Sequence, residues 1–153
     1  MTCQRNMISP EERTEILDTI NHWLHEQIFP YKLPSAQLCE QVITPVNAFR
    51  IITNKKKFDL YFRFGQTWVK SEEKTIVIAR IGFENQRNGY GTSLLKPLTK
   101  IARKYGYNYI AIESVNSNGR AFALNFGFEE HIHSSNYYIS TDKLISKLAI
   151  RYC

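Results

Sequence analysis

Hydrophobic positions at helical spacing mark the first part of the chain. Residues 9–12 read Ser-Pro-Glu-Glu, the order of a helix start in which the serine is the N-cap and the second glutamate closes a capping box. Apolar side chains then recur every three or four residues, which predicts a helix to about Ile28. Two prolines follow, and a shorter helix is expected from Ser35 to about Val42. Residues 1–45 are therefore expected to form a helical segment.

From residue 47 the pattern changes to an alternation of polar and apolar positions. Phe49–Ile52 and Phe58–Phe64 are typical of two strands that form a hairpin, with the lysine run 55–57 at its tip. Trp68 and Val69 are expected to extend this meander.

The most continuous apolar run, residues 75–83, predicts a buried strand. A turn with two glycines follows, and then a hydrophobic stripe that predicts a helix from Thr92 to a glycine cap at Gly106. Pro97 lies inside this helix and is expected to kink it or to disturb one turn.

Three shorter elements complete the pattern. Tyr109–Ile112 is typical of a buried strand, residues 119–125 of a short helix that ends at Gly127, and Tyr137–Ser140 of a last strand. This order of elements predicts one α/β domain over residues 1–153, with a mixed sheet and helices on its faces.

Composition excludes several classes of protein. Hydrophobic residues make up 43% and charged residues 22% of the chain, as in ordinary globular proteins. No apolar run approaches the roughly 20 residues that span a bilayer, and the N-terminus lacks the apolar core of a secretory signal. The three cysteines are scattered, without metal-type spacing, which favours a reducing compartment. We therefore expect a cytoplasmic protein with no membrane partner.

The chain carries a formal net charge of +6 and has a pI near 9.3. Such a charge favours nucleic acid or another polyanion as a partner. The alternative is that the lysines and arginines are spread over solvated faces and partly serve an anionic cofactor. Both interpretations stay open from the sequence.

The turn between the strand at 75–81 and the following helix carries the most specific signal. Residues 86–91 read Gln-Arg-Asn-Gly-Tyr-Gly. Glycines let a backbone approach a phosphate closely, and a helix start offers N–H groups without helical acceptors. An ordinary left-handed glycine turn is the alternative. A dinucleotide fold and a P-loop do not fit, because neither Gly-x-Gly-x-x-Gly with a later acidic residue nor Gly-Lys-Ser/Thr is present.

Two segments instead resemble the GNAT superfamily of acyl-CoA-dependent N-acyltransferases. Residues 86–91 match the Gln/Arg-x-x-Gly-x-Gly/Ala motif at its three defining positions. Residues 112–121 are similar to the family's fifth strand, with Asn118 and Ala121 at its Asn-x-x-Ala positions, and the Gly-Phe pair at 127–128 matches the end of the next helix. The resemblance covers about residues 47–140. It implies a central, mostly antiparallel and splayed β-sheet flanked by helices.

The resemblance also implies where acetyl-CoA lies. Pantetheine is expected to bond to backbone groups near Ile81, where two strands separate, and the pyrophosphate is expected on N–H groups from Arg87 to Thr92. Tyr90 is expected to pack into the core or to cover the cofactor. The cofactor-binding residues that the resemblance implies are Ile81, Gln86, Arg87, Asn88, Gly89, Tyr90, Gly91, Thr92 and Asn118.

The customary proton-handling residues of the family are missing. Acyl transfer from a thioester needs a neutral amine, a stabilised oxyanion and a proton for the departing thiolate. The resemblance implies a backbone N–H near Ile81 as the oxyanion donor. Where members commonly carry a general-acid tyrosine, this chain has Asn125, and the glutamate base of the histone acetyltransferase branch corresponds to Thr75.

Three residues are candidate substitutes. Glu113 lies in an otherwise apolar strand, where a carboxylate is costly unless it is paired or functional. It is a candidate base acting through water, and pairing with Arg80, Arg120 or a helix end is the alternative. Tyr137 and Tyr138 face opposite sides of the last strand, so one of them is a candidate acid and the other a core residue.

Histidine spacing does not indicate a metal. His131 and His133 alternate along an expected strand, but no third ligand stands at a suitable distance, so both are expected to be exposed. His22 and His25 share one helix face and are expected at the surface. We therefore expect no metal site.

The most specific interpretation is an N-acetyltransferase that acts on a primary amine. An acidic protein or an aminoacyl-tRNA is favoured as acceptor, because the chain is basic. A homodimer is a further expectation. One alternative is a catalytically degenerate protein of this fold that acts by binding nucleic acid or protein, and another keeps the fold without binding CoA.

Overall fold

The computed structural model describes residues 6–27, 34–40, 44–53, 55, 58–70, 72–83, 89–113, 115–132 and 135–152. The predicted cofactor residues Gln86, Arg87 and Asn88, together with His133 and two of the three lysines at the hairpin tip, lie outside these ranges. In the described part the elements are α1 Pro10–Gln27, β1 Gln37–Leu38, β2 Ala48–Ile52, β3 Phe58–Gly65, β4 Thr75–Phe83, α2 Tyr90–Tyr105, β5 Tyr109–Ile112, α3 Ser117–Asn125, β6 Glu129–Glu130, β7 Tyr137–Ser140 and α4 Thr141–Tyr152.

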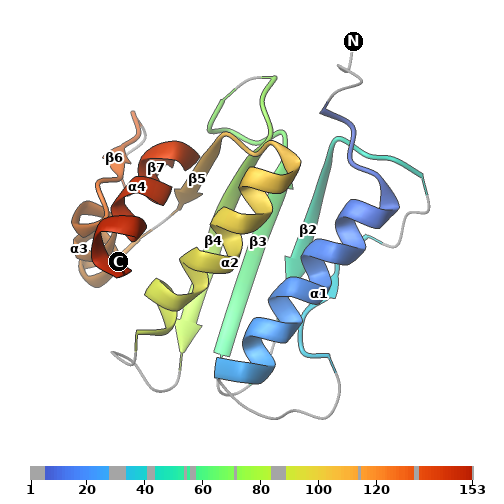
Figure 1. Cartoon of the computed structure of the whole chain (residues 1–153), viewed down its shortest axis with the longest axis horizontal. Helices are drawn as coiled ribbons and strands as arrows, with labels where there is room; N and C mark the ends of the chain where they lie inside the picture. The colour runs from blue at the N-terminus through green and yellow to red at the C-terminus, as the bar shows by residue number, and fades with distance from the viewer. Residues whose placement is uncertain are drawn as a thin grey trace.

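The strands form one sheet in the order β1-β2-β3-β4-β5-β7-β6. Every neighbouring pair is antiparallel except β4 and β5, which are parallel and joined through α2 (Figure 1). The prediction of an α/β fold with a mostly antiparallel sheet is therefore confirmed. The C-terminal helix α4 is an addition that the sequence pattern did not indicate, and the short strand β6 ends at Glu130, before the position of the strand expected at His131.

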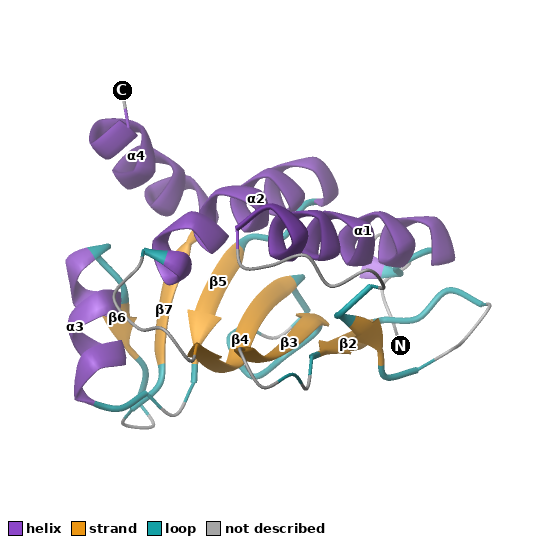
Figure 2. Cartoon of the chain, turned by 90° about the horizontal axis from the view of Figure 1, so that it is seen from below, coloured by secondary structure: helices purple, strands orange, loops and turns teal. Residues whose placement is uncertain are grey.

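Helices α1, α2 and α4 lie on the same side of the sheet (Figure 2). Their apolar stripes meet the inward positions of β2, β3, β4 and β5 in one core, because alternate residues of each strand point to this side. Among the core side chains with no exposed surface are Ile16, Ile51, Leu60, Phe62, Phe64, Ile76, Leu94, Leu98, Ile110 and Leu144. Helix α3 lies at the β6 end of the sheet, away from α1.

Two element predictions were wrong. The helix expected from Ser35 does not form, because Gln37 and Leu38 are strand residues paired with β2 at the edge of the sheet. The N–H of Cys39 also donates to the carbonyl of Arg50, so the backbone is satisfied by the sheet instead of by a helical turn. Trp68 and Val69 do not extend the meander but lie in a bend after β3.

Helix α2 begins two residues before the predicted start and continues past Pro97 to Tyr105. Proline removes one N–H donor from the helix, but the packing of the buried stripe of α2 keeps the helix in one piece. Gly106 has φ 77° and caps the helix, with a cap N–H that donates to the carbonyl of Ala102, as predicted.

The predicted capping box forms only in part. The N–H of Glu12 donates to Ser9 Oγ at 3.1 Å. The carboxylate of Glu12 turns instead to Lys74, with Nζ–Oε2 at 2.9 Å, and accepts a hydrogen bond from the Tyr107 hydroxyl at 2.7 Å. Lys74 also donates to the carbonyl of Tyr105 at 2.7 Å. This buried cluster joins α1 to the start of β4 and to the end of α2.

Candidate functional site

Strand β4 separates from β5 half-way along its length. Their described pairing runs from Thr75–Tyr109 to Ile78–Ile112, whereas β4 continues to Phe83. On the other side of β4, Phe62 pairs with Ile78 but Tyr61 pairs with Arg80, so Ala79 is one extra residue in the ladder. Such a bulge bends a strand and increases its local twist. The pairing with β5 therefore ends at Ile78, where β5 itself ends, and the bulge bends β4 directly after this residue. The resemblance implied a splay near Ile81.

The N-terminus of α2 lies beyond the end of β4. Gly89 has φ 75° and is the N-cap, and among the described residues no side chain is seen to cap the first N–H groups. The first turn contains no acidic residue. A Cβ atom added to Gly89 would have no described atom within 4 Å. The described end of the predicted turn thus combines a left-handed glycine, open space and uncapped N–H groups, a combination that suits an anion.

Gly91 and α3 explain why the first turn of α2 needs a small residue. An added Cβ on Gly91 would contact the ring of Phe122 at 3.4 Å, so α3 packs directly against this turn. The N-cap of α3 is Asn116, whose Oδ1 accepts from the N–H of Gly119 at 3.0 Å. Asn118 lies in the first turn of α3 and is exposed. The helix thus begins two residues earlier than predicted, and the capping asparagine is not the one in the Asn-x-x-Ala pattern.

Glu113 lies one residue beyond β5, and its N–H donates to the carbonyl of Ile78 at the point where the strands part. Its carboxylate accepts from Arg63 Nη1 at 2.7 and 2.9 Å and from Trp68 Nε1 at 2.7 Å. Pairing was one of the expected alternatives, but the predicted partners were wrong. Arg80 pairs with Asp59 instead, and Arg120 donates to Tyr137.

Arg63 and Trp68 are site residues that sequence reasoning missed. The signal for Arg63 was present, because β3 alternates strictly between buried and half-buried positions and Arg63 is on the half-buried side. Trp68 gave no such signal. Gly65, with φ 108°, approaches Asn47 so closely that an added Cβ would lie 2.3 Å from its carbonyl oxygen. The chain turns at this glycine and brings the indole over the side of the sheet that α1, α2 and α4 do not cover.

The two tyrosines of β7 are separated as predicted. Tyr137 is 2% exposed, pairs with Ile112 across the ladder, and its hydroxyl accepts from Arg120 Nε at 3.1 Å. It also lines a cavity of about 200 Å³ together with Val115, Asn116, Ser117, Arg120, Glu130 and Ser135. Tyr138 faces the opposite side, where loss of solvent, a hydrogen bond to Glu129 and the charge of Glu129 raise its pKa.

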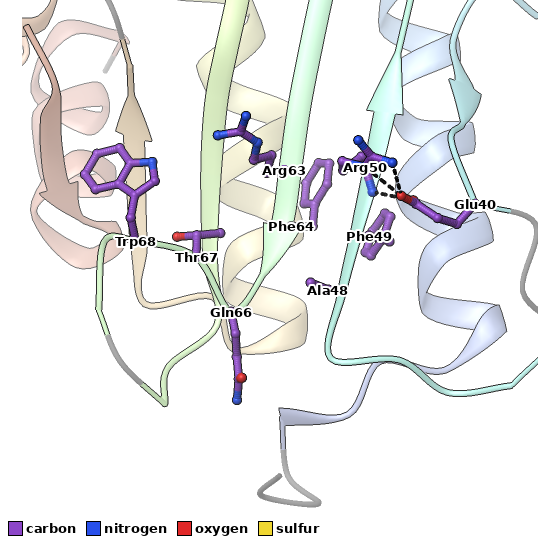
Figure 3. Close-up of a pocket in the computed structure, with 9 residues that line it drawn as sticks. All are labelled: Glu40, Ala48, Phe49, Arg50, Arg63, Phe64, Gln66, Thr67 and Trp68. Carbon is purple, nitrogen blue, oxygen red and sulfur yellow. Dashed lines mark hydrogen bonds and ion pairs between the residues drawn. The ribbon is translucent and has the colours of Figure 1, made fainter.

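A larger cavity, of about 300 Å³, lies on the side of the sheet away from α1 and α2. Figure 3 shows Arg63 and Trp68 on one side of it and Arg50 with Glu40 on the other. Phe49 and Phe64 also line it, although their rings, whose centroids are 4.9 Å apart, belong to the core on the covered side. This cavity does not coincide with the predicted cofactor site, because its lining residues come from β2, β3 and the bend after β3.

The sequence also led us to expect no metal site and no membrane-spanning segment. The described residues contain no cluster of three or more histidine, cysteine or acidic side chains that could hold a metal ion. His131 lies outside β6 and packs its ring against Trp68 at 4.8 Å. No helix in the described part of the chain is long and apolar enough to cross a membrane.

No family model and no curated protein matches the chain. Among solved structures, the KacTA–DNA complex aligns with 87% of this chain and 86% of its own at 13% identity and a TM-score of 0.52. AtaTR bound with acetyl-CoA aligns with 65% and 69% at 13% identity and a TM-score of 0.48. A GNAT-family acetyltransferase candidate from Desulfovibrio desulfuricans aligns with 62% and 69% at 16% identity and a TM-score of 0.42.

At these identities the comparisons show a likeness of fold and nothing about activity. Only the first has a TM-score above 0.5 and extends over most of both chains, so the likeness rests on it. The chain therefore shares its fold with the structure in the KacTA–DNA complex.

Proposed function

We propose that this chain is an N-acetyltransferase that transfers the acetyl group of acetyl-CoA to a primary amine. The observation that carries the proposal is the coincidence of two features at one end of β4. The pairing of β4 with β5 ends at Ile78 while β4 continues past a bulge, and the helix that follows begins at the left-handed Gly89, where no described side chain caps the first N–H groups. An extended thioester arm fits the first feature, and a pyrophosphate fits the second.

In this proposal pantetheine lies between the diverging strands and bonds to the backbone near Ile81, which is 36% exposed. The pyrophosphate lies on N–H groups at the start of α2, from Arg87 to Thr92. Gly89 leaves room for it, and Arg87 adds a charge-assisted contact. Gln86, Asn88, Tyr90, Gly91 and Asn118 complete the proposed cofactor contacts.

The chemistry requires an oxyanion donor and an acid. A backbone N–H near Ile81 stabilises the tetrahedral oxyanion as the amine attacks the thioester carbon. Tyr137 is the better candidate to protonate the departing thiolate, because it pairs with Ile112 and lines a cavity. Its hydroxyl oxygen accepts a hydrogen bond from Arg120, so the hydroxyl proton can be donated. Tyr138 faces Glu129 on the other side of the sheet. Glu113 as base has to take the amine proton while bonded to Arg63 and Trp68.

For the acceptor we favour an acidic protein or an aminoacyl-tRNA, because the net charge of +6 attracts anionic partners. The KacTA complex was solved with DNA, and an AtaT mutant toxin was solved with the C-terminus of the antitoxin AtaR and acetyl-CoA. Protein and nucleic acid partners are therefore the first classes to screen, and a homodimer stays a prediction.

Calorimetric titration with acetyl-CoA tests the cofactor site. We expect wild-type protein to bind, and Gly89→Glu to bind at least tenfold more weakly, because a carboxylate then occupies the pyrophosphate position. Gly106→Glu is the matched control, since Gly106 ends the same helix, has φ 77° and likewise has nothing within 4 Å of an added Cβ. Its affinity should stay within about twofold of wild type. A well-folded wild-type protein that does not bind acetyl-CoA would overturn the proposal.

A non-catalytic binding protein is the second candidate. Two observations favour it: Asn125 stands where the family's tyrosine is common, and Glu113 is already bonded to Arg63 and Trp68. Nucleic acid binding that weakens steeply with salt, together with no acetyl transfer to any amine, would select this alternative.

A further inference from the structure

The cavity of about 300 Å³ on the uncovered side of the sheet is lined by residues of β2 and β3 and has charged walls. Phe49 and Phe64 are among the lining residues, but their side chains are almost fully buried and belong to the core under the helices. Arg50 and Arg63 face each other across β2 and β3 in direct register, and the Trp68 indole forms a further wall (Figure 3). The size fits one small group rather than an extended polymer.

The two arginines differ in how many of their guanidinium N–H groups are available to a ligand. All three nitrogens of the Arg50 guanidinium have partners: Nε and Nη2 contact the carboxylate of Glu40, and Nη1 donates to the hydroxyl of Tyr61. Arg63 donates to Glu113 through Nη1, and among the described residues no acceptor is bonded to its Nε or Nη2. Its side chain is 40% exposed in the cavity. The pair of nitrogens that can bind a carboxylate in a bidentate manner is therefore open on Arg63.

The charge around the cavity argues against a polyanion. Glu40 and Glu113 balance the two guanidinium groups, so the surface lacks the run of unpaired positive charge that a phosphate backbone requires. One carboxylate fits the free edge of Arg63. Glu113, on the other edge of Arg63, also bonds to Ile78 where β4 and β5 separate. A group held by Arg63 is thus next to the proposed acetyl site.

We propose that this cavity recognises a carboxylate of the amine acceptor, with Arg63 as the binding residue and Glu113 and Trp68 as the residues that hold it in position. The inference rests on the proposed function in one respect, since it names the ligand as the acceptor. Binding itself needs no acetyl-CoA, so it is measured without it. If acetyl-CoA fails to bind but the carboxylate binds, the acetyltransferase proposal fails and the carboxylate site stands.

The test compares two peptide amides, Asp-Ala-Ala and Asn-Ala-Ala, which have the same shape and differ by one carboxylate. The indole N–H resonances report the location of binding, because Trp68 lies in the cavity wall whereas Trp23 donates to Ser93 in the helical layer. We expect the Asp peptide to shift the Trp68 resonance and not that of Trp23. We expect the Asn peptide to bind at least tenfold more weakly.

Variants separate a specific contact from general charge. Arg63→Gln should abolish the preference for the Asp peptide, and Arg63→Lys should retain part of it because the charge stays while the bidentate edge is lost. Arg80→Gln, outside the lining of the cavity, should change the preference less than threefold. Thermal unfolding checks that each variant is folded. Equal binding of the two peptides, or a preference that survives Arg63→Gln, would overturn the inference. The inference would also be overturned if a single-stranded oligonucleotide shifted the Trp68 resonance in an Arg63-dependent manner while the Asp peptide did not.

Discussion

The face of the sheet under α1, α2 and α4 is packed with apolar side chains, whereas the opposite face carries three arginine–carboxylate pairs. On the covered face the inward residues of β3, from Phe58 to Phe64, are at most 2% exposed. On the other face Arg50–Glu40, Arg63–Glu113 and Arg80–Asp59 have partly exposed side chains. The difference indicates that stability comes from one face, while the other is free to bind ligands.

The largest effect is expected at the buried ion pair that closes the covered face. Lys74→Met leaves the carboxylate of Glu12 without its charged partner in a site where both side chains are less than 10% exposed. Breaking such a pair costs about 3–5 kcal/mol. Urea denaturation measures the loss, and the double variant with Glu12→Gln should recover part of it. A loss comparable to that at an exposed pair would contradict the contrast between the faces.

A core leucine should come next. Leu98→Ala removes a fully buried side chain from the stripe of α2 and should lower the free energy of unfolding by about 2–5 kcal/mol. Leu124→Ala is the control, because Leu124 is on α3 and is 50% exposed. Its effect should stay within roughly 0.5 kcal/mol. Similar losses in the two variants would show that the helical layer does not dominate stability.

The smallest effect is expected on the uncovered face. A double-mutant cycle with Arg80→Gln and Asp59→Asn should give a coupling below about 1 kcal/mol, because both side chains are exposed by more than two fifths. The coupling should fall further at high salt. A coupling as large as that of the Lys74 pair would mean that the uncovered face also determines stability.

Local signals were sufficient for most elements. The serine N-cap and the spacing of Ile16, Ile20 and Leu24 located α1, and the alternation in β3 located a strand with one polar side. The prediction failed where a contact outside the segment decided the conformation. Gln37 and Leu38 are strand residues because they pair with β2. This pairing partner cannot be recognised from the sequence of the segment alone.

The candidate site divides in the same way. The glycine turn could be predicted from residue types, because a left-handed N-cap at Gly89 and close packing of Gly91 against Phe122 both require very small residues. Whether Glu113 is a base or the partner of an ion pair could not be decided from the sequence. Its partners Arg63 and Trp68 are 50 and 45 residues away along the chain.

The sequence by itself indicated most of the helical and extended segments and a glycine turn at a helix start, since these depend on the spacing of side chains and on local backbone freedom. Only the tertiary structure decided that the pairing of β4 with β5 ends at Ile78, that Glu12 bonds to Lys74, and that no described acceptor lies on one edge of Arg63 in a cavity. Each of these depends on which distant groups the sheet brings together, and such pairings are fixed by packing rather than by local sequence.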